Sequence, residues 1–212
     1  MSSSERLRLQ VSPWLALLLG AFVLLSSPAL LAALLAALLT AALVHELAHW
    51  AVLRRLGGEV RSLQLGLFGA RMEIAHPERL SYGGEMLVTA AGPLVNLLLA
   101  PGLAWLGREA EVFWLFAGAQ LVLGCFNLLP VRPLDGGRLL WLAAAWRHGP
   151  FQADRLCAAV GLAAALALTA GSTALCLRTG SAPFLMIGAL GTLFAALGGK
   201  KGLSNLRKAC KI

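Results

Sequence analysis

Long apolar segments constrain this chain more than any other feature of its sequence. A helix needs about 20 apolar residues to cross the roughly 30 Å hydrocarbon core of a membrane. Segments near that length occur at 11–27, 29–53, 84–106, 112–129, 156–177 and 182–197. With 58% hydrophobic and 13% charged residues over 212 positions, the chain lacks the polar side chains that cover a soluble domain of this size. The sequence therefore predicts an all-α polytopic membrane protein with about six transmembrane helices.

The basic residues predict the orientation of these spans, because Lys and Arg collect on the cytoplasmic side of a membrane. If the N-terminus is inside and all six segments cross, every Lys and Arg except Arg108 and Arg178 falls on the inner side. We therefore expect both termini in the cytoplasm, one transmembrane domain over residues 1–199 and a basic tail at 200–212. This asymmetry accounts for the net charge of +8. Since the basic residues form no stripe interleaved with aromatics, no nucleic-acid partner is expected.

The segment between the second and third spans has a different periodicity. Residues 60–74 alternate between apolar and polar side chains around a glycine-flanked tip, which is typical of a β-hairpin. Because Leu63, Leu65 and Leu67 share one face, the short hairpin is expected to lie at the membrane surface. Its open edge could accept an unwound substrate segment as an added strand. A disordered amphipathic loop is the alternative.

His45, Glu46 and His49 form the pattern HExxH inside the second span. Residues four apart project from one face of a helix, so both imidazoles can reach a single ion while Glu46 points at a water molecule there. Ionisable residues are costly inside a membrane and indicate function by default. Hydrogen bonding to neighbouring helices is the alternative reading. The pattern predicts Zn²⁺ bound by His45 and His49, with Glu46 as the catalytic base.

A catalytic zinc site has a third protein ligand and keeps one open position. The chain offers several candidates for this ligand, namely Asp135, Glu73, Glu85, His76, His148, Asp154 and Cys125. Asp135 is favoured because two prolines precede it and two glycines follow it, so the fourth span must end there in irregular backbone. The charge count also places it on the side of the membrane nearer to His45. A helix is expected to restart at about Gly137, and a capping role for Asp135 is the alternative.

Two asparagines lie in apolar surroundings near these motifs. Asn96 lies in the third span, and Asn127 lies toward the end of the fourth. Both are candidates for substrate binding, because an amide is a natural partner for a substrate strand or for an oxyanion. Alternatively, either residue bridges helices by hydrogen bonds. Gly92 and Pro93 are expected to serve close helix packing rather than chemistry.

Three motifs in this order resemble the signatures of a known family. They are His45-Glu46-Leu47-Ala48-His49, Ala91-Gly92-Pro93-Leu94-Val95-Asn96, and Asn127-Leu128-Leu129-Pro130 through Pro133-Leu134-Asp135-Gly136-Gly137-Arg138. Over residues 29–147 the chain is similar to the site-2 protease family of intramembrane zinc metalloproteases, peptidase family M50. The resemblance implies a zinc ion held by His45, His49 and Asp135, with Glu46 as catalytic base. It also implies a membrane protein substrate and regulated proteolysis within the lipid bilayer.

Within that family, the layout is similar to stage IV sporulation protein FB. This likeness implies cleavage of a membrane-tethered precursor of a sporulation sigma factor in a bacterial cell membrane, around the forespore, with regulatory membrane proteins as further partners. That group often ends in a nucleotide-binding CBS domain, which we do not expect here. Two rivals fit parts of the pattern. A catalytically silent scaffold would need a closed site with four protein ligands, and a transporter would usually show an inverted repeat, which is not visible.

Overall fold

The computed structural model describes residues 9–11, 28–66, 69–74 and 80–179. The chain divides into two compact units, residues 1–127 and residues 128–212, and each is described by itself. The single domain expected over residues 1–199 stays a prediction. Apart from Val11, the first predicted span lies outside the described residues, as do the sixth span and the basic tail.

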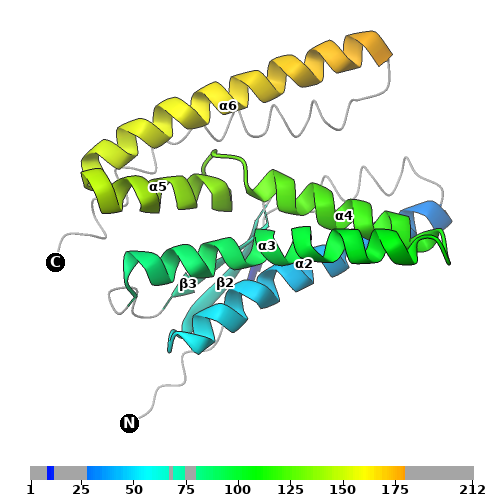
Figure 1. Ribbon diagram of the computed structural model, residues 1–212, viewed down its shortest axis with the longest axis horizontal. Coiled ribbons are helices and arrows are strands. Elements are labelled where there is room, and N and C mark those ends of the chain that lie inside the picture. The colour runs from blue at the N-terminus through cyan, green and yellow to red at the C-terminus, as the bar shows by residue number, and fades with distance from the viewer. Residues whose placement is uncertain (1–8, 12–27, 67–68, 75–79, 180–212) are drawn as a thin grey trace. The chain divides into compact units, whose positions relative to one another are not determined.

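Helices α2 (Pro28–Arg55), α3 (Tyr82–Leu106) and α4 (Val112–Asn127) form the body of the first unit. Each of them contacts the other two, and they lie side by side (Figure 1). Ala37 and Ala41 of α2 are buried against Ala119 of α4. Small side chains let helix backbones approach closely inside a membrane, where lipid gives no hydrophobic drive for helices to associate. The alanine-rich sequence of α2 therefore explains how its polar residues come within reach of the neighbouring helices.

The described helices include three that are long and apolar enough to cross a membrane, at Ala32–Arg55, Tyr82–Leu106 and Pro150–Thr179. They coincide with the second, third and fifth predicted spans, which are confirmed as apolar helices of spanning length. Helix α4 is apolar but shorter. Large apolar side chains project outward, with Leu98 exposed by 74% and Leu177 by 82%. An outer surface of this kind is suited to lipid rather than to water.

Strands connect α2 to α3. β2 (Val60–Gly66) pairs antiparallel with β3 (Gly69–Ile74) where the alternation predicts a hairpin, and Leu63 lies opposite Met72. A further strand, β1 (Leu9–Val11), pairs in parallel with the other edge of β2, so that the strand order is β1-β2-β3. Strand β1 is not predicted from the sequence, because so short a segment beside an apolar stretch has no measurable periodicity. The described fold is therefore helical with a small three-stranded sheet.

The second unit contains α5 (Asp135–His148) and α6 (Pro150–Thr179), which pack against each other. A loop at residues 128–134 precedes α5 and folds back over its first turn. A Cβ atom at Gly136 would overlap the carbonyl oxygen of Leu128, and one at Gly137 would lie 2.6 Å from the carbonyl carbon of Val131. The two glycines therefore let the loop backbone pass directly over the start of the helix.

A polar cluster ties this loop to the helices of its own unit. Arg132 forms an ion pair of 3.2 Å with Asp154 of α6, and Trp141 of α5 donates its indole N–H to the same carboxylate oxygen at 2.8 Å. The Arg132 guanidinium carbon also lies 5.5 Å from the centre of the Trp141 ring, within cation–π range. These contacts hold the loop in place within the unit, so Asp135 starts α5 from a supported position.

Candidate metal centre

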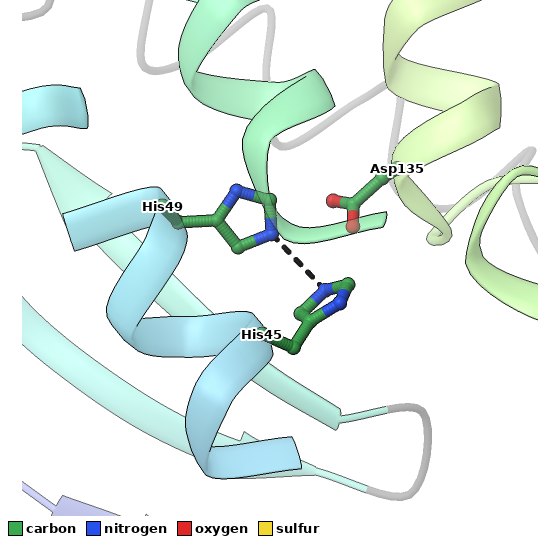
Figure 2. A group of neighbouring side chains, drawn as sticks. All are labelled: His45, His49 and Asp135. Atoms are coloured by element: carbon green, nitrogen blue, oxygen red, sulfur yellow. Dashed lines mark hydrogen bonds between the residues drawn. The ribbon is translucent and has the colours of Figure 1, made fainter. Parts of the chain in front are cut away.

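The two histidines of the HExxH pattern turn their rings toward one another from successive turns of α2 (Figure 2). Their Nε2 atoms are 3.1 Å apart, and the ring planes meet at 84°. His45 is 4% exposed and His49 is 8% exposed. The helical repeat thus places both imidazoles on one face, as the spacing predicts.

The outer nitrogens of both rings face oxygen atoms of α3. Nδ1 of His45 lies 3.2 Å from Oδ1 of Asn96, and Nδ1 of His49 lies 2.7 Å from the backbone carbonyl oxygen of Val88. Amide and carbonyl oxygens only accept hydrogen bonds, so each Nδ1 is the donor. The two Nε2 atoms face each other across 3.1 Å, where they share a hydrogen bond if one of them carries a proton. With the ring protons on Nδ1, both Nε2 lone pairs can instead bind one metal ion, so this geometry suits a shared ion.

Zinc fits this donor pair. Two imidazole ligands at 2.0–2.1 Å from a tetrahedral zinc ion lie about 3.3 Å apart, which is close to the observed separation of 3.1 Å between the two Nε2 atoms. Ligating histidines also characteristically donate their other ring N–H to a carbonyl or carboxylate, which fixes the ring. His45 and His49 have this second interaction in place.

Gly92 of α3 makes room for both rings. A Cβ atom there would overlap Nε2 of His49 and would lie 2.8 Å from Cε1 of His45. The sequence predicted a packing role for Gly92, but it did not predict that Gly92 lies against the two candidate ligands. Val88, Gly92 and Asn96 follow one another at four-residue spacing, so they share one face of α3. The four-residue spacing could have predicted that Gly92 and Asn96 face the same neighbouring helix. Val88 could not be predicted in this way, because it contacts His49 through a backbone carbonyl that any residue would supply.

Glu46 is half-buried on α2, next to His45 in sequence. Asn127 is the last residue of α4 and is 8% exposed, and its Nδ2 donates to the carbonyl oxygen of Leu123 in the same helix at 3.2 Å. Asn96 is fully buried between helices and contacts α2, which matches the bridging alternative. The substrate-binding role of Asn127 stays a prediction.

Asp135 belongs to the second unit, where it is half-buried and is the first residue of α5. The helix begins there rather than at Gly137, and an acidic side chain in a first turn is favoured by the helix dipole. Leu134 occupies the N-cap position without a side-chain capping bond, so the capping alternative for Asp135 is not borne out. The assignment of Asp135 as the third ligand beside His45 and His49 stays a prediction.

The other candidate ligands have different surroundings. Asp154 bonds Arg132 and Trp141, His148 is exposed at the end of α5, and Cys125 is exposed on α4. Glu85 lies in the first turn of α3. Glu73 and His76 lie outside the residues whose side chains the structure describes.

The sequence is similar to a known protein family and to several zinc metalloproteases. Residues 103–168 match the model of peptidase family M50. The chain is 39% identical over 131 residues to the putative zinc metalloprotease Rip3 of Mycobacterium tuberculosis, a match covering 57% of this chain and 32% of that protein. It is 34% identical over 113 residues to stage IV sporulation protein FB of Bacillus subtilis, covering 51% of this chain and 38% of that protein.

A solved structure, the site-2 protease from Methanocaldococcus jannaschii, has the same fold. The match has a TM-score of 0.67 at 21% identity and covers 93% of this chain and 92% of that one. In contrast, the chain spans only about a third of the length of the curated relatives just described. The apolar helices and the family match together indicate a membrane protein. Residues 103–168 and the relatives described above therefore make this chain similar to peptidase family M50, and the solved structure shows that it shares the fold of a site-2 protease.

Proposed function

We propose that this chain is an intramembrane zinc metalloendopeptidase, which hydrolyses a peptide bond in or near a membrane-embedded segment of a substrate protein. The observation that carries the proposal is the buried imidazole pair. Both Nδ1 atoms face acceptors on α3, and the two Nε2 atoms lie 3.1 Å apart. Glu46 directly follows His45 in the sequence. The match of residues 103–168 to peptidase family M50 supports the same activity.

In this proposal His45 and His49 hold the ion through their Nε2 atoms, and Asp135 supplies the third ligand. A zinc ion held by these residues would polarise the scissile carbonyl and lower the pKa of a bound water molecule. Glu46 takes a proton from the attacking water at its carboxylate oxygen and delivers it to the leaving amide nitrogen.

The proposed protease also has a defined topology, substrate class and substrate-binding edge. We propose six spans with both termini in the cytoplasm, which the distribution of Lys and Arg supports. The relationship to stage IV sporulation protein FB supports a membrane-tethered sigma-factor precursor as the substrate class. The outer edge of β3 is the place where an unwound substrate segment would add as a strand, since β1 pairs with the other side of the hairpin at β2.

Replacing Asp135 with Asn tests the third ligand. The amide keeps the size of the side chain but is a much weaker ligand than a carboxylate, so we expect zinc affinity to fall by at least about 100-fold, more than the usual loss for an outer-shell partner. Zinc per chain, measured by atomic absorption on protein purified in detergent, should fall well below that of the wild type. Cleavage of a co-expressed membrane protein should fall with it.

Glu111→Gln is a matched control, because it removes an exposed acid in the turn between α3 and α4. It should leave both zinc content and cleavage unchanged. Full zinc occupancy in Asp135→Asn would contradict the assignment and move the third ligand to another residue.

A further inference from the structure

Asn96 is a buried polar residue in the otherwise apolar middle of α3. The residue is 0% exposed. A buried amide without partners destabilises a fold, so its hydrogen bonds decide whether it is tolerated. Both of its polar atoms find partners on α2.

These two bonds fix which way the amide points. Nδ2 donates to the backbone carbonyl oxygen of Ala41 at 3.3 Å. Because that carbonyl oxygen only accepts, the NH₂ group must face it, and Oδ1 must therefore face His45. The oxygen in turn only accepts, so the hydrogen on the His45 ring is placed on Nδ1, at 3.2 Å from Oδ1.

A proton on Nδ1 leaves the lone pair of His45 on Nε2, which is the atom that faces His49. His49 obtains the same tautomer from the backbone carbonyl of Val88, one face of α3 thus serving both rings. The two rings differ in one respect: the acceptor for His49 is part of the helix backbone, whereas the acceptor for His45 is a side chain. Substitution at residue 96 can therefore change the support of His45 alone.

We propose that Asn96 is a positioning residue, which selects the Nδ1–H tautomer of His45 and aims its Nε2 at the metal, rather than a substrate-binding residue. The inference rests on the proposed zinc site. An incoming substrate strand would have to break the contacts of a side chain that has no exposed surface. Loss of such a ligand partner lowers metal affinity by about 10–100-fold.

The test compares the zinc affinity of purified full-length variants in detergent, measured by competition with a chelator. Asn96→Leu removes the acceptor, and we expect a 10- to 100-fold weaker affinity. Asn96→Asp keeps an acceptor oxygen for His45 and should recover most of the affinity. Gln120→Leu is the matched control, because it replaces another buried amide, one whose Oε1 has no hydrogen-bond partner within the described part of the chain. It should leave the affinity unchanged.

A second measurement reads the hydrogen bond directly. In zinc-loaded protein with ¹⁵N-labelled histidine, the proton on Nδ1 of His45 should be protected from solvent exchange in the wild type and in Asn96→Asp. It should exchange faster in Asn96→Leu at saturating zinc, while the Nδ1 proton of His49 keeps its protection as an internal reference. A merely structural role for Asn96 would not single out one of the two rings.

Several results would overturn the proposal. Unchanged zinc affinity in Asn96→Leu together with a raised KM for cleavage would assign the residue to substrate binding. An equal loss of affinity in Gln120→Leu would attribute the effect to general packing. Coordination of zinc through Nδ1 of His45 in the wild type would reverse the deduced tautomer, and this wild-type result decides the matter even if Asn96→Leu does not fold. A wild-type chain that binds zinc but cleaves no substrate would contradict the proposed protease function, and it would leave the role of Asn96 in zinc binding intact.

Discussion

Glu46→Gln is expected to retain one zinc ion per chain and to lose cleavage by about 100- to 10,000-fold, the usual contribution of a general acid–base group. Glutamine has nearly the same shape as glutamate, so the fold of α2 and the imidazole pair beside it should persist. Its amide cannot accept a proton from water at neutral pH. The proton transfer assigned to Glu46 would then have no acceptor, although the metal ligands would all remain.

The experiment has two readouts on the same preparation. Zinc is measured on protein purified in detergent, and cleavage is followed on a doubly tagged single-span membrane protein that the wild-type chain cleaves when the two are co-expressed. Inhibition of the wild type by 1,10-phenanthroline shows that cleavage depends on metal, and Glu109→Gln, at an exposed acid after α3, serves as the charge control. Wild-type cleavage by Glu46→Gln would remove Glu46 from the mechanism.

Gly92→Ala is expected to weaken zinc binding strongly, although it adds only one methyl group. The new Cβ would overlap Nε2 of His49 and would lie 2.7 Å from Cε1 of the same ring. His49 cannot simply move aside, because its Nδ1 is held by the carbonyl oxygen of Val88 at 2.7 Å. Relief of the overlap would break that bond or separate α3 from α2. We expect zinc affinity to fall at least about 100-fold, beyond the loss of an outer-shell partner, and cleavage to fall with it.

Gly102→Ala is the matched control for this change. Gly102 lies in the same helix, and a Cβ there would meet nothing within 4 Å. An alanine in place of glycine in a helix interior stabilises by about 0.5–1 kcal/mol, so this variant should keep its zinc and unfold at a slightly higher temperature. If Gly92→Ala bound zinc as tightly as Gly102→Ala, the close approach of α3 to the imidazole rings would be contradicted.

Much of this arrangement follows from local sequence patterns. The spacing of His45 and His49 fixes a shared helix face, and the alternation over residues 60–74 indicates the strands β2 and β3. The prolines before Asp135 also mark correctly where α4 ends. These patterns depend on nearest-neighbour geometry, which a single sequence contains.

Long-range partners could not be predicted in the same way. The strand β1 pairs with residues more than fifty positions away, and its three residues have no pattern that would indicate this pairing. Val88 orients His49 through a backbone carbonyl that every residue possesses. Asn96 was predicted from the sequence to bind substrate or to bridge helices, but only the packing of α3 on α2 shows that His45 and Ala41 are its partners.

Zinc K-edge X-ray absorption on the purified wild-type chain tests the central claim most directly. The account predicts a four-coordinate zinc ion with two imidazole nitrogens at about 2.0–2.1 Å and oxygen atoms in the remaining positions, one of them from a carboxylate. A sulfur ligand at about 2.3 Å, or the scattering of fewer than two imidazoles, would contradict it.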